Sequence, residues 1–269
     1  MNYETIQRFS SVKCDGGDPN SESNLIFTGP SMPFPSTLEY VAQYLELANH
    51  SGGVANLGVG VRFPKHWWGA GQWVNATPAF TDDTTDAQDA GTNDFPLETL
   101  TNNDGFVVYS PRKFNLINLL VGVASVTGTP VRVVKFSNGS GWGAAQTGTN
   151  LLQGPITSAH WTAAEHLIWW EMPAGWELTT GHANEGGLPV GVYAVLIQST
   201  TAPTGTAGVA STMSVHHLPF TRREVADNGV VTWGASDKGF SLGHGEGVSV
   251  AFSVAGAQNA VRGSVRARG

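Results

Sequence analysis

Residues 166–181, HLIWWEMPAGWELTTG, place three tryptophans and two glutamates within nine positions. A pair of carboxylates is the catalytic equipment of most glycosidases, and the distance between them decides between retention and inversion. Glu171 and Glu177 are therefore candidates for glycan cleavage. The same segment also suits two β-strands joined at Pro173-Ala174-Gly175, because proline presets φ and glycine accepts a positive φ in a turn.

The hairpin is the first interpretation of this segment. Consecutive side chains of a strand face opposite sides of the sheet, so Trp169 and Trp170 cannot form one flat platform. We expect one of the two rings to enter the core and the other to face outward. An outward Trp170 would serve as a sugar platform or an interface anchor, and the sequence leaves the distance between Glu171 and Glu177 open.

A second group of aromatic residues lies in the glycine-rich stretch FPKHWWGAGQW. Exposed aromatic side chains in such loops stack on sugars or anchor partner proteins. Adjacent tryptophans also close the open end of a β-sandwich, and the sequence does not separate the two roles. The candidate residues for binding a glycan or a partner are Trp67, Trp68, Trp73, Trp142 and Trp170.

The segment between Thr81 and Ser110 contains seven acidic residues and no lysine or arginine. Calcium binding needs six or more converging oxygens, and the EF-hand spacing is absent here. A solvated polar loop is the first interpretation and a calcium site the alternative; no other cofactor is expected. The candidate ligands are Asp82, Asp83, Asp86 and Asp89.

No motif for nucleophilic or zinc chemistry is present. The chain has neither a GxSxG elbow nor an HExxH pair, and His216 and His217 diverge if they lie in a strand. The single cysteine, Cys14, has no base beside it and excludes an internal disulfide. These observations favour a protein that is not an enzyme.

The segment STLEYVAQYLELANH predicts the one short amphipathic helix of the chain, at about 37–49. Ser36 and Glu39 match a capping box, and "SGG" would end the helix. Leu38, Val41 and Leu45 recur at spacings of three and four, so we expect them to contact a sheet or a neighbouring subunit.

From Val54 onward, nine or ten predicted strands follow one another without strand–helix alternation. This pattern predicts a mainly β protein, an antiparallel, jelly-roll-like β-sandwich with an extended N-terminal arm. Asn228-Gly229 is a strong hairpin signal. The expected segments are an arm with the helix at 1–53, the sandwich at 54–258 and a basic tail at 259–269.

The net charge of −7 argues against broad binding to nucleic acid or to an anionic membrane. The basic tail is the exception, since Arg262, Arg266 and Arg268 could contact nucleic acid or an acidic neighbour. No apolar run approaches the ~20 residues of a membrane span, and the N-terminus lacks the pattern of a signal peptide. We therefore expect synthesis in a host cytoplasm without export by the standard route.

Three stretches of residues 105–200 carry a resemblance: KFNLINLLVGVASVTGTPVRVVKFSNGSG, EMPAGWEL and LPVGVYAVLIQST. They resemble the β-sandwich modules of virion proteins from tailed bacteriophages. The resemblance implies a non-enzymatic particle component of a tail fibre, spike or head decoration, often trimeric and glycan-binding. The implied partners are further copies of the chain, other virion proteins and a host surface glycan, and the implied location is the virion.

Three functions follow from the sequence. The leading hypothesis is a structural virion protein that assembles through its termini, with Leu38, Val41, Leu45 and the tail arginines as contacts. The second is a carbohydrate-binding module based on the candidate tryptophans. The third is a glycan-cleaving enzyme that uses Glu171 and Glu177, or acids of the 82–104 segment.

Overall fold

The structure of the protein is a computed structural model. It describes residues 4–13, 27–28, 39–50, 52–89, 94–145, 160–163, 165–217, 223–233, 240–242, 246–252 and 260–268. Antiparallel β-sheets dominate it, with 45% of residues in strands and 7% in helices. The predicted fold class, a mainly β protein of the sandwich type, is confirmed.

The chain divides into two compact units. The first unit combines Met1–Pro64 with His216–Gly269, and the second is Lys65–Val215. The second unit is thus an insertion within the first, where the sequence predicts three consecutive segments.

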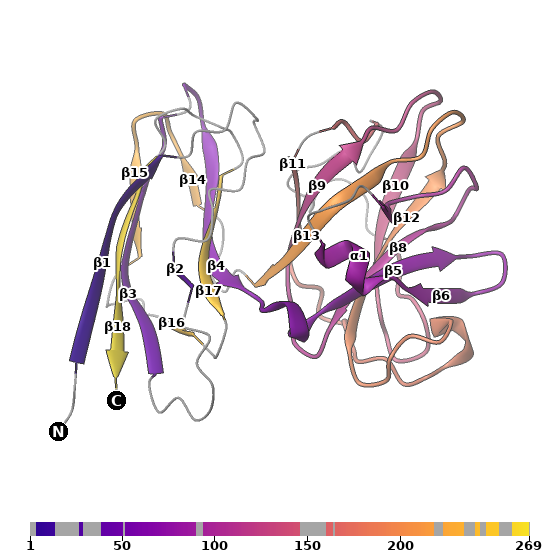
Figure 1. The fold of residues 1–269 in the computed structure, drawn as a ribbon, viewed down its shortest axis with the longest axis horizontal. Helices are drawn as coiled ribbons and strands as arrows, with labels where there is room; N and C mark the ends of the chain where they lie inside the picture. Colours follow the sequence, from indigo (N-terminus) through magenta and orange to yellow (C-terminus); the bar gives the residue numbers. More distant parts are fainter. Residues whose placement is uncertain are drawn as a thin grey trace. The chain divides into compact units, whose positions relative to one another are not determined.

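One sheet of the first unit contains the first and the last of the described strands. Its strands run in the order β1-β18-β3-β15, all antiparallel, and β16 also pairs with β3. Figure 1 shows β18 between β1 and β3. The strands are β1 (Glu4–Lys13), β3 (Glu39–Ala48), β15 (Val230–Trp233), β16 (Phe240–Leu242) and β18 (Ala260–Arg268).

The other layer of the first unit is built around β4. Strands β14 and β17 pair with β4, β2 pairs with β17, and the last two residues of β13 pair with the end of β4. In Figure 1 this layer faces the sheet of β1, β18 and β3, which makes the unit a sandwich. The strands are β2 (Phe27–Thr28), β4 (Ala55–Arg62), β13 (Val209–His217), β14 (Arg223–Val225) and β17 (Gly247–Phe252).

The predicted helix at about 37–49 is wrong, because residues Glu39–Ala48 form strand β3. Here β-branched and aromatic residues such as Val41 favour a strand, and pairing with β18 outweighs the helical spacing. At the end of this strand Leu47 and Ala48 are both buried, with 0% and 8% of their surface exposed, while Glu46 is partly exposed. Val41 and Leu45 are therefore strand positions, and Leu38 lies outside the described residues.

The predicted basic tail at 259–269 is also wrong over Ala260–Arg268, which form the strand between β1 and β3. The register sets Arg262 opposite Glu46, and Arg266 opposite Val41. Arg268 is opposite Glu39 on β3 and Glu4 on β1. Opposite charges at directly paired positions stabilise an antiparallel pair. The arginines thus occupy strand positions in a sheet that also contains residues 4–13 of the predicted arm.

Asn228-Gly229 forms a turn but not the predicted hairpin. Asn228 has a φ of 61°, and the Gly229 N–H donates to Ala226 O over 2.9 Å. The flanking strands β14 and β15 pair with β4 and β3 respectively. The turn therefore carries the chain from one layer of the sandwich to the other.

Deleting residues 260–269 should abolish cooperative folding of the first unit, because β18 is the strand that joins β1 to β3. We expect limited proteolysis of the variant to degrade the first unit and leave a fragment close to Lys65–Val215, read by mass spectrometry. Deleting Gly269 alone is the control and should change nothing. A 260–269 deletion that unfolds like the full chain would show that the segment is a free tail.

The main sheet of the second unit has the strand order β10-β12-β8-β5-β6. Strand β8 lies at its centre, and Phe106, Val107 and Val108 in succession are fully buried, which is typical of a strand covered on both faces. The strands are β5 (Gly69–Val74), β6 (Ala79–Asp82), β8 (Gly105–Ser110), β10 (Val131–Phe136) and β12 (Tyr193–Thr201).

The second layer of this unit has the order β11-β9-β13, with β7 paired to β13. Figure 1 shows β9 and β13 lying over the sheet of β8 and β12. Strands β8, β9, β10 and β12 lie in the region after Val54 for which the sequence predicts a series of strands. The remaining elements are β7 (Phe95–Pro96), β9 (Leu116–Val123), β11 (Glu165–Trp169), the 3-10 helices η1 (Lys65–Trp67) and η2 (Ala183–Glu185), and α1 (Thr84–Gln88).

A buried ion pair joins the two layers of the second unit. The Arg132 Nη2 lies 2.6 Å from Glu98 Oε2, and both side chains are 0% exposed. Ser199 Oγ–H donates to the same carboxylate over 3.0 Å, and the Gly208 N–H donates to it over 3.3 Å. The Arg132 guanidinium also lies 4.6 Å from the ring centre of Trp161. Burial lowers the pKa of Arg132, and Glu98 opposes that shift.

Removing one partner of this ion pair should destabilise the second unit strongly. Glu98→Gln leaves the Arg132 guanidinium buried without a counter-charge, so we expect a loss of about 3–5 kcal/mol in the free energy of unfolding. Urea titration followed by tryptophan fluorescence measures it. The exposed Glu177→Gln is the matched control and should cost less than about 0.5 kcal/mol. Equal effects of the two substitutions would contradict the role of the ion pair.

Candidate functional site

The tryptophan-rich segment 166–181 contributes to an aromatic core. Trp170 and Trp176 are 6.4 Å apart between ring centres and pack against Phe114 and Phe136, with edge-to-face angles throughout. Aromatic pairs favour such edge-to-face contacts over stacked ones. The Trp176 Nε1–H donates to Ala194 O over 3.1 Å, so the polar end of this ring is also satisfied.

The expectation that one of Trp169 and Trp170 faces outward is wrong. The two side chains are 4% and 1% exposed. Strand β11 ends at Trp169, so the alternation of a strand no longer applies at the next residue. The short apolar run around these residues also fits a segment buried on both sides.

The predicted hairpin around Pro173 is wrong as well, although the turn is present. The Trp176 N–H donates to Pro173 O over 3.3 Å, which closes the turn. Strand β11 pairs with β9, while the Glu177 N–H donates to Ser137 O. Partners distant in sequence therefore replace the local pairing that the turn residues suggest.

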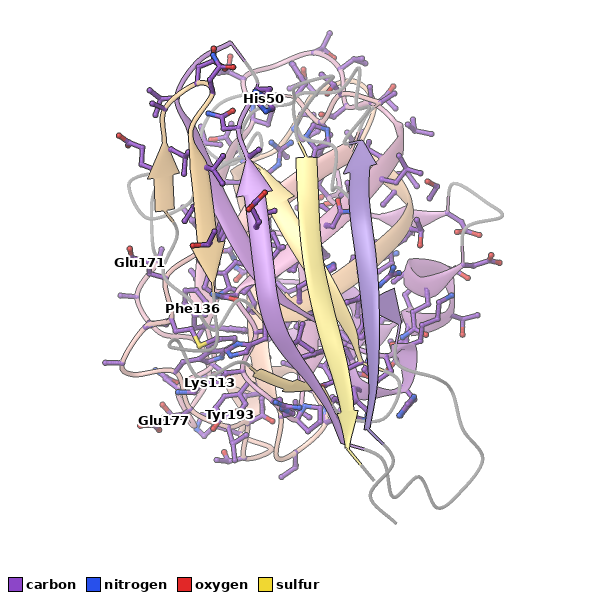
Figure 2. All side chains as sticks on the ribbon, turned by 90° about the vertical axis from the view of Figure 1, so that its left-hand side faces the viewer. His50, Lys113, Phe136, Glu171, Glu177 and Tyr193 are labelled. Carbon is purple, nitrogen blue, oxygen red and sulfur yellow. The ribbon has the colours of Figure 1, made fainter. Side chains whose placement is uncertain are left out.

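Glu171 and Glu177 are both exposed. Figure 2 shows the two side chains apart, with Phe136 between them in this view. A glycosidase needs its two carboxylates to converge on one bond. The structure gives these residues no such arrangement.

Three of the five candidate tryptophans belong to the core. Trp68, Trp73 and Trp170 are buried, which contradicts their expected role as platforms. Trp142 is partly exposed and meets the Trp73 ring edge-on at 5.3 Å, and Trp67 is partly exposed as well. Large aromatic side chains bury much apolar area each, which suits them to a core.

The glycine-rich stretch after Trp67 is strand β5 and not a loop. Its glycines permit close approach of neighbouring strands, since a Cβ on Gly71 would lie 2.0 Å from Thr81 O. A Cβ on Gly69 would lie 2.3 Å from the Tyr109 ring. The glycines therefore mark a packed strand, and this is why the loop prediction fails.

One end of the main sheet of the second unit carries two cation–aromatic pairs. The Arg112 guanidinium lies 5.2 Å from the ring centre of Trp67, and the Lys113 ammonium lies 5.1 Å from that of Tyr193. Figure 2 shows Lys113 and Tyr193 close together, in agreement with this distance. We call these four residues the basic–aromatic end.

The strand register explains why these residues meet. Tyr109 at the end of β8 pairs with Gly69 of β5, and Ser110 pairs with Tyr193 of β12. The start of β5, the end of β8 and the start of β12 therefore lie at the same end of the sheet. The sequence pointed to Trp67 but not to the other three. The signal for Arg112 and Lys113 is the SPRKF sequence at the end of a buried strand.

The acidic segment contains the short helix α1 and strand β7, so it is not the long loop expected. Asp82 accepts hydrogen bonds from Tyr109 Oη–H over 2.8 Å and from the Thr84 N–H over 3.0 Å. Burial raises the pKa of Asp82, but these hydrogen bonds outweigh it and the net pKa is lowered. Burial and the bond to Asp82 raise the pKa of Tyr109 to about 12.

The four candidate calcium ligands lie at the end of strand β6 and in or beside helix α1. Asp82 ends β6, Asp83 precedes α1, Asp86 lies in it and Asp89 follows it. Among the described residues, no group of three or more histidine, cysteine, aspartate or glutamate side chains is placed to hold a metal ion.

A serine and a histidine that sequence analysis did not pair lie in contact. Ser125 Oγ is 3.3 Å from His160 Nδ1 and also accepts the Trp161 N–H over 2.8 Å. His160 Nε2 is 3.2 Å from Gly128 O. Because Ser125 is buried, this contact ties two segments of the chain together and does not present a nucleophile.

Asp83 should make the stability of the second unit depend on pH. Burial, a hydrogen bond with Asp86 and nearby carboxylates raise its pKa from 3.8 to about 6. The folded state therefore holds this proton more tightly than the unfolded state, and stability is lost as the pH rises from about 4 through 6. Asp83→Asn should therefore be more stable than the wild type at pH 8 and unfold at a higher temperature. For a partly exposed charge we expect the free energy of unfolding to rise by about 0.5–1 kcal/mol.

Thermal unfolding at pH 4 and pH 8 tests this. The gain of Asp83→Asn should be much smaller at pH 4, where Asp83 is protonated in the folded state and partly protonated in the unfolded state. Asp82→Asn is the contrasting variant, and it should be less stable than the wild type at pH 8, because the pKa of Asp82 is lowered. An equal effect of Asp83→Asn at both pH values would rule out titration as the cause.

The chain matches no protein-family model, and neither a curated protein nor a solved structure matches it. Within the described residues, no helix is both long and apolar enough to cross a membrane.

Proposed function

We propose that the protein is a non-enzymatic structural component of a phage-like virus particle. In this proposal the first unit attaches the chain to its neighbours in the particle, and the inserted second unit is displayed. The proposal concerns how the chain is built and anchored, and it requires no chemical step.

The observation that carries the proposal is the position of the two chain ends. Strands β1 and β18 are neighbours over most of their length, from the Glu4–Arg268 pair to the Lys13–Ala260 pair. Neither β1 nor β18 can therefore detach from the sheet without breaking the backbone hydrogen bonds between them. A unit closed in this way is suited to bearing load within an assembly.

The connection to the second unit supports the same role. The chain leaves the first unit after β4 and returns at the end of β13, where Arg62 pairs with His216 and Val61 with His217. Entry and exit are thus neighbouring antiparallel strands. A folded insertion held by two paired strands is tethered more firmly than a domain on a single linker.

The stretches that resemble phage virion modules also support the proposal. They correspond to β9, β10 and β12 of the second unit and to the turn at Pro173. The assembly contacts predicted at the termini need revision, since Val41, Leu45 and the three arginines are strand positions. Strand β1 pairs with β18 alone among the described residues, so its other edge is the proposed place for a neighbouring chain.

Immunogold labelling of particles from cells that express the gene tests the proposal. Antibodies against the full chain should label intact particles, and the chain should sediment with them through a sucrose gradient. Preimmune serum on the same grids is the control. A chain that stays entirely in the soluble fraction, with no gold on any particle, would refute the proposal.

A further inference from the structure

We propose that the basic–aromatic end of the second unit binds a sugar that carries a carboxylate. This inference names a ligand class for a surface of the second unit. It does not depend on the protein being part of a particle.

The binding groups are held in place by the fold. Arg112 and Lys113 are consecutive, and the next residue, Phe114, is fully buried against Trp170 and Trp176. This anchor fixes the backbone from which the two cationic side chains extend. Preorganised groups lose less conformational entropy when a ligand binds, so binding is tighter than for free surface side chains.

The aromatic partners orient the two cations. Arg112 is exposed and lies over the partly exposed Trp67, and Lys113 lies over the partly exposed Tyr193. A guanidinium presents a planar fork of N–H donors that matches a carboxylate in two parallel hydrogen bonds. The partly exposed Trp67 ring adds an apolar face for the C–H groups of a pyranose.

The charge of the second unit also favours this end for an anion. Within Lys65–Val215 there are five lysines and arginines against 11 acidic residues. Arg132 is neutralised in the buried ion pair, and Lys135 lies on β10. The other three cations are Lys65, Arg112 and Lys113, which lie at or beside the basic–aromatic end.

Acidic residues at the same end of the sheet would set the orientation of the bound ligand. Asp82 on β6 lies two strands from β8 in the sheet, which corresponds to ~10 Å at the usual strand spacing. A ligand that spans this edge would place its carboxylate near Arg112 and Lys113 and its hydroxyl groups toward Asp82 and Asp83. A uniformly sulfated polymer would be repelled by the acidic side, so the surface fits a sugar acid better than a polyanion.

The first experiment compares matched acidic and neutral sugars in calorimetric titrations of the full chain at low salt. The pairs are sialyllactose and lactose, hexagalacturonate and its methyl ester, and a hyaluronan and a chitin oligosaccharide. We expect at least one acidic member to bind ten-fold or more tightly than its neutral partner. Equal affinities within every pair, or no binding at millimolar concentration, would overturn the proposal.

Variants then locate the site for the acidic sugar that binds best. Arg112→Gln and Trp67→Ala should each weaken binding ten-fold or more, and Arg112→Lys should have an intermediate effect because it keeps the charge and loses the fork. Thr77→Asp is the control for net charge. It changes the charge by the same amount as Arg112→Gln, but on the exposed turn at the opposite end of β5.

An unchanged affinity in Arg112→Gln would overturn the assignment, and so would an equal loss in Thr77→Asp, which would indicate nonspecific attraction. Thermal unfolding of each variant confirms that the second unit remains folded. Failure here is independent of the labelling experiment, because sedimentation with particles requires no sugar.

Discussion

The ion pair between Glu98 and Arg132 is the interaction on which the second unit depends most. Burying two charges costs several kcal/mol unless each is matched by a counter-charge and hydrogen bonds. Here the carboxylate accepts bonds from Arg132, Ser199 and Gly208, and the guanidinium lies against Trp161. These partners come from β10, β12 and the segments before β8, β11 and β13. A shift of any one of these segments would expose a buried charge to water or leave it without its partner. The ion pair therefore favours a single register of the strands in both layers.

Once the layers are fixed, the tryptophans have a structural explanation. A β-sandwich needs bulky side chains to fill the space between sheets ~10 Å apart, and aromatic rings supply that volume with few residues. Trp161, Trp170 and Trp176 perform this function in the second unit. The side chains left for recognition are those at the ends of strands, where the sheet stops and the core no longer covers them. Trp67 and Tyr193 are in this position, and each lies against a cation, while Tyr193 also meets the buried Trp176 edge-on at 5.6 Å.

The sequence was sufficient for strands β8, β10 and β12 of the second unit, but it was insufficient for β5 of that unit and for β3 and β18 of the first unit. Strands β8, β10 and β12 are short apolar runs bounded by turn residues, and local signals identify them. Strand β3 has an equally good helical spacing, and its pairing with distant strands makes it a strand, above all with β18, more than 200 residues further along. The basic–aromatic end escaped prediction for the same reason. The register brings Trp67 next to Arg112, and Tyr193 next to Lys113, and no single stretch of sequence encodes these contacts.

Because the second unit is inserted in the first, its folding affects the folding of the first unit. Every strand pair of the main sheet of the second unit joins residues within Lys65–Val215, whereas the sheet of the first unit needs residues 4–13 and 260–268 together. Loop closure costs more entropy as the loop lengthens, but the cost rises only logarithmically and falls if the intervening chain is already compact. Folding of the second unit shortens the effective loop that separates β4 from the end of β13. The inserted sandwich therefore lowers the entropic cost of closing the unit that contains it.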